Sequence, residues 1–343
     1  MKKLLNTLYI TTQGAYLRQE GECVVVEVER QERLRLPLHT LGGIVAFGNV
    51  LCSPFLLGLC GERGVQVSFL TERGQFLARV QGPVSGNILL RREQYRRAEL
   101  PDAALAIAKN ILTAKLANGR TVLQRSLRDH PESDADGQTA KAIARLGHTL
   151  DTLDIISDRE VLRGIEGDAA KLYFSVFDRM VTTEKDAFFM RERSRRPPLD
   201  NLNALLSFLY TLLAHDAEAA CEGVGLDPQQ GFLHAVRPGR PSLALDLMEE
   251  FRPVIADRLA LSLINLRQVA GKGFKTTETG AVTMDDETRK AVLIAYQKRK
   301  QDEIRHPFLQ EDVPVGLLLH VQALLLARHL RGDLDAYPPF VWK

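Results

Sequence analysis

The sequence predicts an α+β protein of more than one domain, with a small β-sandwich-like domain followed by a larger all-α domain. Short runs rich in Val, Leu, Tyr and Thr alternate with turn residues over about the first 80 positions. Apolar residues then recur at three- and four-residue spacing as far as about residue 330. The two patterns meet at Gly82 and Pro83, residue types that interrupt helices and strands alike.

The first predicted domain, residues 1–85, consists of short strands separated by turn residues at Gly14, Gly21 and Pro37. We expect a short helix over residues 54–60, between the last strands. Strands this short, with turns this frequent, are typical of a small β-sandwich-like domain. The strands are expected at residues 7–11, 15–18, 23–28, 33–36, 43–47, 65–70 and 76–81.

A linker is predicted over residues 86–100, and the helical domain over residues 101–343. Helical spacing is clearest at Ile107, Ile111, Leu112 and Leu116. The segment 271–276 has the residue types of a phosphate-binding loop but lacks the spacing that such a loop requires, so we expect a loop or a hairpin there.

Composition indicates a folded protein of a reducing compartment. The 343 residues are 45% hydrophobic and 26% charged, with a net charge of +2. The four cysteines show no metal-binding spacing. No window approaches the roughly 20 apolar residues that a membrane span requires, and polar residues interrupt any signal-like stretch at the start. We therefore expect a cytoplasmic protein that does not contact a membrane.

Basic residues gather in three clusters, although the whole chain is nearly neutral. Each cluster taken alone is typical of a solvated helix face, but three clusters in a nearly neutral chain indicate an uneven distribution of charge. A DNA-binding surface and solvated helix faces are therefore about equally supported. The clusters are Arg91, Arg92, Arg96 and Arg97; Arg191, Arg193, Arg195 and Arg196; and Lys298, Arg299, Lys300 and Arg305.

The segment 242–253 predicts a buried helix, with Ser242 as its N-cap. Asp246 and Glu249 are three residues apart and therefore share one face of this helix. Carboxylates among Leu, Met and Phe are costly unless they are paired or bound to a metal. Two interpretations stay open: ion pairs with Arg240 or Arg252, or a metal site.

A second candidate acid is Glu166, which lies between Gly164 and Gly167. Glycines allow a backbone or a ligand to approach closely. The alternative is an ordinary acid at the start of a helix, where the helix dipole favours a negative charge.

Three segments of the chain, taken together, resemble the family of CRISPR-associated protein one, the integrases of CRISPR spacer acquisition. In chain order they read Gly-Ile-Glu-Gly-x-Ala-Ala from residue 164, Phe-Leu-His from residue 232, and Ser-Leu-Ala-Leu-Asp-Leu-Met-Glu-x-Phe-Arg-Pro from residue 242. The resemblance covers essentially the whole chain and implies a β-rich domain followed by a helical catalytic domain. The last segments, from residue 312 to residue 340, are similar to the branch found with compact type I systems.

The resemblance implies a metal site for Mg²⁺ or Mn²⁺, because two carboxylates and one imidazole form a mixed oxygen and nitrogen ligand set. Some family members have Asp at the last ligand position, where this chain has Glu. The catalytic metal ligands fall on Glu166, His234 and Glu249, a supporting acid on Asp246, and basic residues near DNA on Arg240 and Arg252.

The activity that the resemblance implies is that of a metal-dependent DNA endonuclease and integrase. Such an enzyme joins the 3′-hydroxyl ends of spacer DNA into the repeat array by phosphodiester transesterification. The resemblance further implies a homodimer held largely by the β domain, which binds double-stranded DNA, the small second protein of the adaptation complex and an accessory nuclease that trims prespacers. The alternative is a non-catalytic DNA-binding scaffold of the same fold, which the three competent ligand positions argue against.

Overall fold

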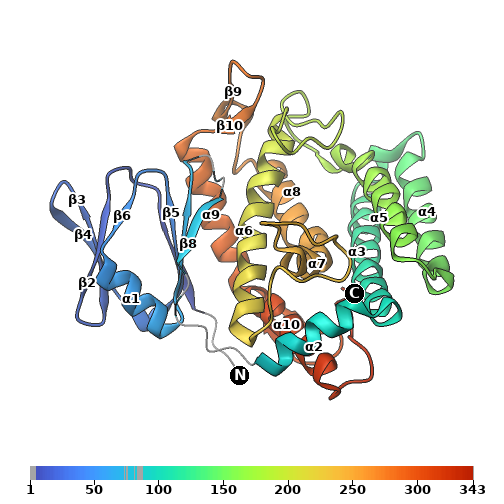
Figure 1. Cartoon of the computed structure of the whole chain (residues 1–343). Helices are drawn as coiled ribbons and strands as arrows, with labels where there is room; N and C mark the ends of the chain where they lie inside the picture. Colours follow the sequence, from blue (N-terminus) through green and yellow to red (C-terminus); the bar gives the residue numbers. More distant parts are fainter. Residues whose placement is uncertain (1–4, 73, 75, 81, 83–87, 343) are drawn as a thin grey trace.

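The computed structural model describes residues 5–72, 74, 76–80, 82 and 88–342. Figure 1 shows a β-rich region built from the first part of the chain and a larger helical region beside it. The predicted boundary at residue 85 lies outside the described residues, so the division into two domains stays a prediction.

The β-rich region consists of two four-stranded sheets. One has the order β1-β5-β7-β8, and the other has the order β4-β3-β2-β6. Helix α1 (Pro54–Arg63) begins at Ser53, whose hydroxyl accepts a hydrogen bond from the Leu56 amide at 3.2 Å, and it connects β6 to β7. The strands are β1 (Asn6–Ile10), β2 (Tyr16–Glu20), β3 (Cys23–Val28), β4 (Gln31–Pro37), β5 (Leu41–Phe47), β6 (Leu51–Cys52), β7 (Gln66–Leu70) and β8 (Phe76–Val80).

The described strands agree closely with those expected from the sequence, and β6 is an addition to them. Position 81, the last of the predicted strand 76–81, lies outside the described residues. Parallel pairing joins β1 to β5 and β5 to β7, whereas β7 and β8 are antiparallel.

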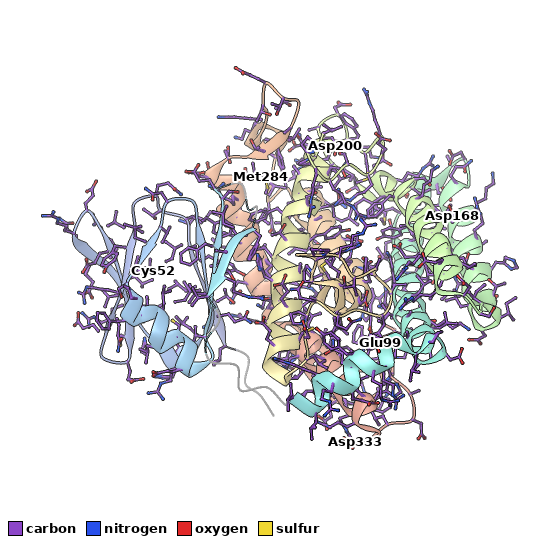
Figure 2. The ribbon with its side chains drawn as sticks, in the orientation of Figure 1. Cys52, Glu99, Asp168, Asp200, Met284 and Asp333 are labelled. Atoms are coloured by element: carbon purple, nitrogen blue, oxygen red, sulfur yellow. The ribbon has the colours of Figure 1, made fainter. Side chains whose placement is uncertain are left out.

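Strand β5 is buried on both of its faces. Ile44 and Ala46 belong to the core between the two sheets, while Val45 and Phe47 belong to the core of the helical region. Because successive side chains of a strand point to opposite faces, one strand can serve both cores. The Phe47 ring lies 6.0 Å from the ring of Phe208 on helix α6. The β-rich region therefore packs directly onto the helices, and side chains fill the space between them (Figure 2).

The helical region surrounds α7, which contacts both α3 and α6 (Figure 1). Helix α3 spans 29 residues, and its predicted apolar residues are buried. A π-helical turn, Arg252–Asp257, joins α7 to α8. The helices are α2 (Ile88–Glu99), α3 (Pro101–Asp129), α4 (Gln138–Thr152), α5 (Arg159–Phe174), α6 (Asn201–Val224), α7 (Ser242–Phe251), α8 (Arg258–Asn265), α9 (Asp286–Gln301) and α10 (Leu318–Arg331).

Two small antiparallel ladders accompany these helices. Strands β9 (Phe274–Thr276) and β10 (Val282–Met284) form a hairpin, which is one of the two structures expected for the segment 271–276. Strands β11 (Glu303–Arg305) and β12 (Asp312–Pro314) form the other ladder, which the sequence did not predict. In the part of the chain that the structure describes, no helix combines the length and apolar character needed to cross a bilayer.

Most of the expected linker over residues 86–100 is helical, because residues 88–99 form helix α2. The Gln94 side chain is fully buried and donates to the carbonyl oxygens of Asp227 and Gln230, both at 2.8 Å. Glu93 pairs with Arg97 one helical turn later, at 2.7 Å. A local ion pair and a buried amide thus stabilise this helix.

Candidate functional site

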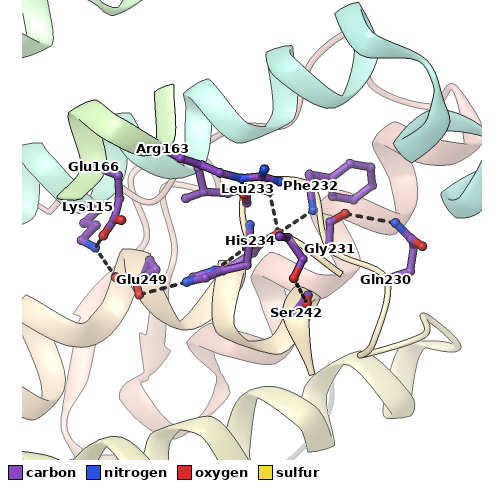
Figure 3. Close-up of polar contacts among 12 residues, drawn as sticks. Lys115, Arg163, Glu166, Gln230, Gly231, Phe232, Leu233, His234, Ser242 and Glu249 are labelled. Atoms are coloured by element: carbon purple, nitrogen blue, oxygen red, sulfur yellow. Dashed lines mark hydrogen bonds and ion pairs between the residues drawn. The ribbon is translucent and has the colours of Figure 1, made fainter. Parts of the chain in front are cut away.

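The three predicted ligands come together from separate parts of the chain (Figure 3). Glu166 lies on α5, Glu249 lies on α7, and His234 lies in the loop that precedes α7. The ammonium group of Lys115, on α3, is paired with Glu166 and lies 2.7 Å from Oε2 of Glu249. His234 Nε2 lies 3.9 Å from Oε1 of Glu249. Glu166 and His234 are 68 residues apart in the sequence, and the fold brings them to the same site.

Asp246 fixes the orientation of His234. Its Oδ1 atom lies 2.7 Å from Nδ1 of the imidazole and accepts the His234 amide at 2.8 Å. Its Oδ2 atom accepts the backbone amides of Phe232 and Leu233, at 2.6 Å and 2.9 Å. A carboxylate at Nδ1 keeps a proton on that nitrogen, so the Nε2 lone pair is available on the side of Glu249. This is the contact expected of the supporting acid.

Gly231 allows the loop to approach α7 closely. A Cβ atom at this position would lie 2.8 Å from Oδ2 of Asp246 and 2.8 Å from atoms of Ser242. Ser242 is the first residue of α7 rather than its N-cap, and its hydroxyl donates to the Ala235 carbonyl at 3.1 Å. The predicted cap is therefore wrong, since the serine ties the loop to the helix instead.

Glu249 is an ionised acid in a buried position, with 3% of its side chain exposed. Its Oε1 atom accepts from Arg252 at 2.6 Å, and its Oε2 atom faces Lys115. Burial alone would raise the pKa of this carboxyl, but Arg252, Lys115 and His234 outweigh that effect and hold the pKa well below its usual range. The ion-pair interpretation of this helix is therefore correct for Glu249 and Arg252, and it leaves a charged carboxylate at the site.

Glu166 lies in the middle of α5, so the alternative of a helix-start acid is wrong. The side chain is 25% exposed, far more than that of Glu249. A Cβ atom added at Gly164 or Gly167 would meet nothing within 4 Å. The two glycines thus leave open space next to Glu166 rather than serving the packing of the chain.

The expected contact of Arg252 with DNA is corrected by its burial. The residue is only 6% exposed, and its guanidinium lies 4.2 Å from the centre of the Tyr210 ring. Its charge is directed to Glu249. A side chain enclosed in this way cannot reach a DNA backbone, so we assign Arg252 to the interior of the site.

Arg240 is half-buried in the loop before α7, among other arginines. Burial and then repulsion from Arg237, Arg163 and Arg195 lower the pKa of Arg240, although Asp246 opposes them. Arg237 is exposed, and Arg163 donates from Nε to the Leu233 carbonyl at 2.6 Å. Several positive charges held together in this way are suited to an anion with more than one negative charge.

Sequence reasoning missed Lys115, Arg163 and Arg237. A signal for Lys115 did exist, because it follows Ile111 by four residues and so lies on the buried stripe of α3. A charged residue on a buried stripe needs a partner. Arg163 precedes Glu166 by three residues and so shares its helix face, whereas Arg237 lies in a loop that has no periodicity to interpret.

The donor set fits a divalent metal, although the ligands do not form a closed cage. Among the described residues, no three His, Cys, Asp or Glu side chains are grouped closely enough to hold a metal ion as they stand. Lys115 occupies the space between Glu166 and Glu249. A cation thus already lies between these carboxylates, and Nε2 of His234 lies 3.9 Å from the other oxygen of Glu249. Two carboxylates and one imidazole suit Mg²⁺ or Mn²⁺.

The neighbouring acid, Glu250, serves a different purpose. It accepts hydrogen bonds from the Phe340 amide at 2.8 Å and from Gln322 Nε2 at 3.0 Å, and it contacts the Tyr337 hydroxyl. Asn118 of α3 holds the same segment by donating to the Phe340 carbonyl at 2.8 Å and accepting from the Trp342 amide at 2.8 Å. Glu250 therefore anchors residues 337–342 and is no part of the candidate metal site.

Comparisons with known proteins give one consistent result. The model of the family described as CRISPR associated protein Cas1 matches residues 8–298. The chain is 57% identical over 344 residues to a CRISPR-associated endonuclease Cas1 from Chlorobaculum tepidum, with 100% of both chains covered.

Two solved structures have the same fold. A casposase bound to its integration product has a TM-score of 0.85 and 23% identity, covering 99% of this chain and 95% of the casposase chain. A chain of a Cas6-RT-Cas1–Cas2 complex has a TM-score of 0.82 and 21% identity, covering 100% of this chain and 36% of the other. These likenesses confirm the predicted fold class, a β-rich region followed by a helical region.

Proposed function

The chain belongs to the CRISPR-associated Cas1 family, and from this premise we propose that it cuts and joins DNA at the site formed by Glu166, His234 and Glu249. Membership of the family confirms the resemblance seen in the sequence. Like its curated relative, the protein is an endonuclease, and the family supports a role as a CRISPR nuclease and integrase. Its place in the branch of compact type I systems stays a prediction.

One observation carries the assignment of the site: the carboxylates of Glu166 on α5 and Glu249 on α7 both pair with Lys115, and Nε2 of His234, in the loop before α7, lies 3.9 Å from Glu249. Glu166, His234 and Glu249 would hold Mg²⁺ or Mn²⁺. When bound, the ion polarises the phosphodiester and offsets the charge that develops on it during displacement.

The side chains of the protein prepare this site in three ways. Arg252 and Lys115 keep Glu249 ionised, and Asp246 presents Nε2 of His234. Arg163, Arg237 and Arg240 form a positive margin that we propose binds the DNA backbone on either side of the reacting phosphate. Positioning of the duplex is thereby separated from the chemistry at one phosphate.

The proposed reaction is a transesterification that needs no covalent bond to the protein. The 3′-oxygen of the incoming DNA forms a new P–O bond while the bond to the 3′-oxygen of the repeat strand breaks. The proton of the attacking hydroxyl is passed through solvent to the departing oxygen, so the number of phosphodiester bonds is unchanged. In the hydrolytic reaction water takes the place of the attacking hydroxyl.

We also propose that the protein acts as a homodimer and assembles with a Cas2 protein on double-stranded DNA, with an accessory nuclease that trims the DNA ends. The structural neighbour in a complex with Cas2 and the casposase bound to an integration product support Cas2 and DNA as partners. Phe55 on α1 and Leu51 on β6 are 80% and 61% exposed, which supports a dimer contact on the β-rich region.

The test compares strand transfer with DNA binding. We expect Glu166→Gln and His234→Ala to abolish integration of a 3′-hydroxyl end in Mn²⁺, and EDTA to do the same to the unaltered protein. DNA affinity should change little, because these residues act on one phosphate. If His234→Ala integrates DNA at the unaltered rate, the catalytic assignment is wrong and the scaffold alternative takes its place.

A further inference from the structure

Lys115 lies between the two carboxylates of the proposed metal site. Its ammonium group is paired with Glu166 and lies 2.7 Å from Oε2 of Glu249, and its side chain is 11% exposed. Glu166 belongs to α5, Glu249 to α7 and Lys115 to α3, so this one charge joins three helices (Figure 3). The lysine is therefore built into the site and is not a surface residue that happens to lie near it.

A divalent ion and this ammonium group compete for the same oxygens. An ion bound by both carboxylates would lie about 2.0–2.6 Å from their oxygen atoms, which is the space that Lys115 Nζ now fills. Two cations at such a distance would repel each other strongly in a poorly solvated site. Metal binding must therefore break the lysine ion pairs, and the observed metal affinity is reduced by the free energy of those pairs.

We propose that Lys115 is a positioning residue that acts as a resident counter-ion: it holds Glu166 and Glu249 together before metal binds, and it lowers the affinity of the site for the divalent ion that displaces it. The inference rests on the proposed function, because it takes these two carboxylates as metal ligands.

The structure provides a place for the displaced side chain. Lys115 lines a narrow cavity of about 30 Å³, together with Gly119, Tyr173 and Asp257. Such a volume accommodates a group of the size of a water molecule. Asp257, whose carboxylate accepts from the hydroxyls of Tyr173 and Tyr210, also lines this cavity and is not one of the proposed metal ligands. The described structure thus has space beside Lys115 that lies away from Glu166 and Glu249.

The central experiment measures Mn²⁺ binding by calorimetry on metal-free protein, without DNA. Lys115→Met keeps the length of the side chain and removes its charge. We expect Mn²⁺ to bind this variant about tenfold more tightly or better, since a pair of close charges is no longer broken. Lys115→Arg should restore weak binding, because it keeps the charge.

Lys109→Met is the matched control. Lys109 lies on the same helix, but its ammonium donates to the Asp154 carbonyl at 2.8 Å and not to a carboxylate of the site. Its removal should leave the Mn²⁺ affinity unchanged. A second readout is thermal unfolding in EDTA, where Lys115→Met should be less stable than the unaltered protein and should gain more from added Mn²⁺.

The outcomes separate this inference from the proposed function. If the unaltered protein and Lys115→Met both fail to bind Mn²⁺, the metal centre itself is wrong, and the inference falls with it. If the unaltered protein binds Mn²⁺ and Glu249→Gln does not, yet Lys115→Met binds no more tightly, then only the counter-ion role is overturned. A purely structural lysine would give that last result together with lower stability.

A measurement on the unaltered protein covers the case in which Lys115→Met does not fold. In a crystal structure with Mn²⁺ bound, we expect Lys115 Nζ to lie beyond about 4 Å from at least one of the two carboxylates, the limit for an ion pair. A structure in which Mn²⁺ is bound and Lys115 still bridges Glu166 and Glu249 would refute the proposal.

Discussion

The two faces of α7 place adjacent acids in opposite environments. Glu249 and Glu250 are 3% and 0% exposed, so both have lost nearly all contact with water. Glu249 meets the cations Lys115 and Arg252, whereas the partners of Glu250 that the structure describes are the neutral groups of Gln322, Tyr337 and Phe340. The pKa of Glu249 is held below its usual range, and burial raises that of Glu250 to about 8 in spite of its hydrogen bonds.

A third acid falls between these two. Burial raises the pKa of Asp257 to about 6, while Arg252 and the hydroxyls of Tyr210 and Tyr173 oppose the rise. Among these three acids, the pKa is lowest where positive charges lie closest to the carboxyl. The proposed metal site therefore depends on cations that take no part in ligation.

The largest expected effect is the difference in the free energy of unfolding between Glu249→Gln and Glu250→Gln, which alter the two faces of α7. Glu249→Gln leaves Arg252 without its negative partner and Lys115 with Glu166 alone, and we expect a loss of about 3–5 kcal/mol in the free energy of unfolding. Glu250→Gln replaces a neutral group by one of nearly the same shape, and we expect a loss of about 1 kcal/mol or less. Urea unfolding in EDTA measures both. Equal losses would refute the contrast between the two faces.

The intermediate acid gives a pH test. The folded pKa of Asp257, about 6, lies above the ordinary value of 3.8 for an aspartate. The folded state thus binds the proton of Asp257 more tightly than the unfolded state does. The stability gained from this proton is complete below the pKa of the unfolded state and is lost as pH rises through the pKa of the folded state. We expect the unaltered protein to lose up to roughly 3 kcal/mol, relative to Asp257→Asn, between about pH 4 and pH 6. Parallel stability curves of the two proteins over this range would contradict the assignment.

The smallest expected effect concerns the two arginines for which DNA contacts were expected. Arg240→Ala should weaken DNA binding for all sequences alike and reduce the slope of log affinity against log salt by about 0.9, the value for one phosphate contact. Arg252→Ala serves as the control: it should destabilise the protein without changing that slope, since the side chain is buried. Filter binding at several salt concentrations measures these slopes. Equal slopes for Arg240→Ala and the unaltered protein would exclude a phosphate contact by Arg240.

Much of the fold could be predicted because the spacing of apolar residues and the residue types at turns are properties of the local sequence. The strands from β1 to β8, apart from β6, and helix α1 followed from them. Helix α2 was not predicted as an element of its own because residues 86–100 were expected to form a linker, and the burial of Gln94 depends on a loop more than 130 residues away.

The residues of the candidate site were identified from the resemblance, and contacts between them were inferred from residue spacing. An ion pair with Arg252 was one of the two interpretations left open for the segment 242–253, and the structure contains this pair with Glu249, but a local pattern cannot tell whether such a pair is buried. The place of Lys115 between two carboxylates depends on how α3, α5 and α7 pack together, which no local pattern contains.

Gly231 has a consequence for how variant libraries of this protein are interpreted. Replacement by Ala would place a methyl group 2.8 Å from the carboxylate that orients His234. In a selection for integration, this position should tolerate substitution as poorly as the proposed ligands do, although it offers no side chain to metal or DNA. A ranking of positions by intolerance would therefore mark Gly231 as catalytic, and only a measurement of imidazole geometry would show that it acts by leaving room.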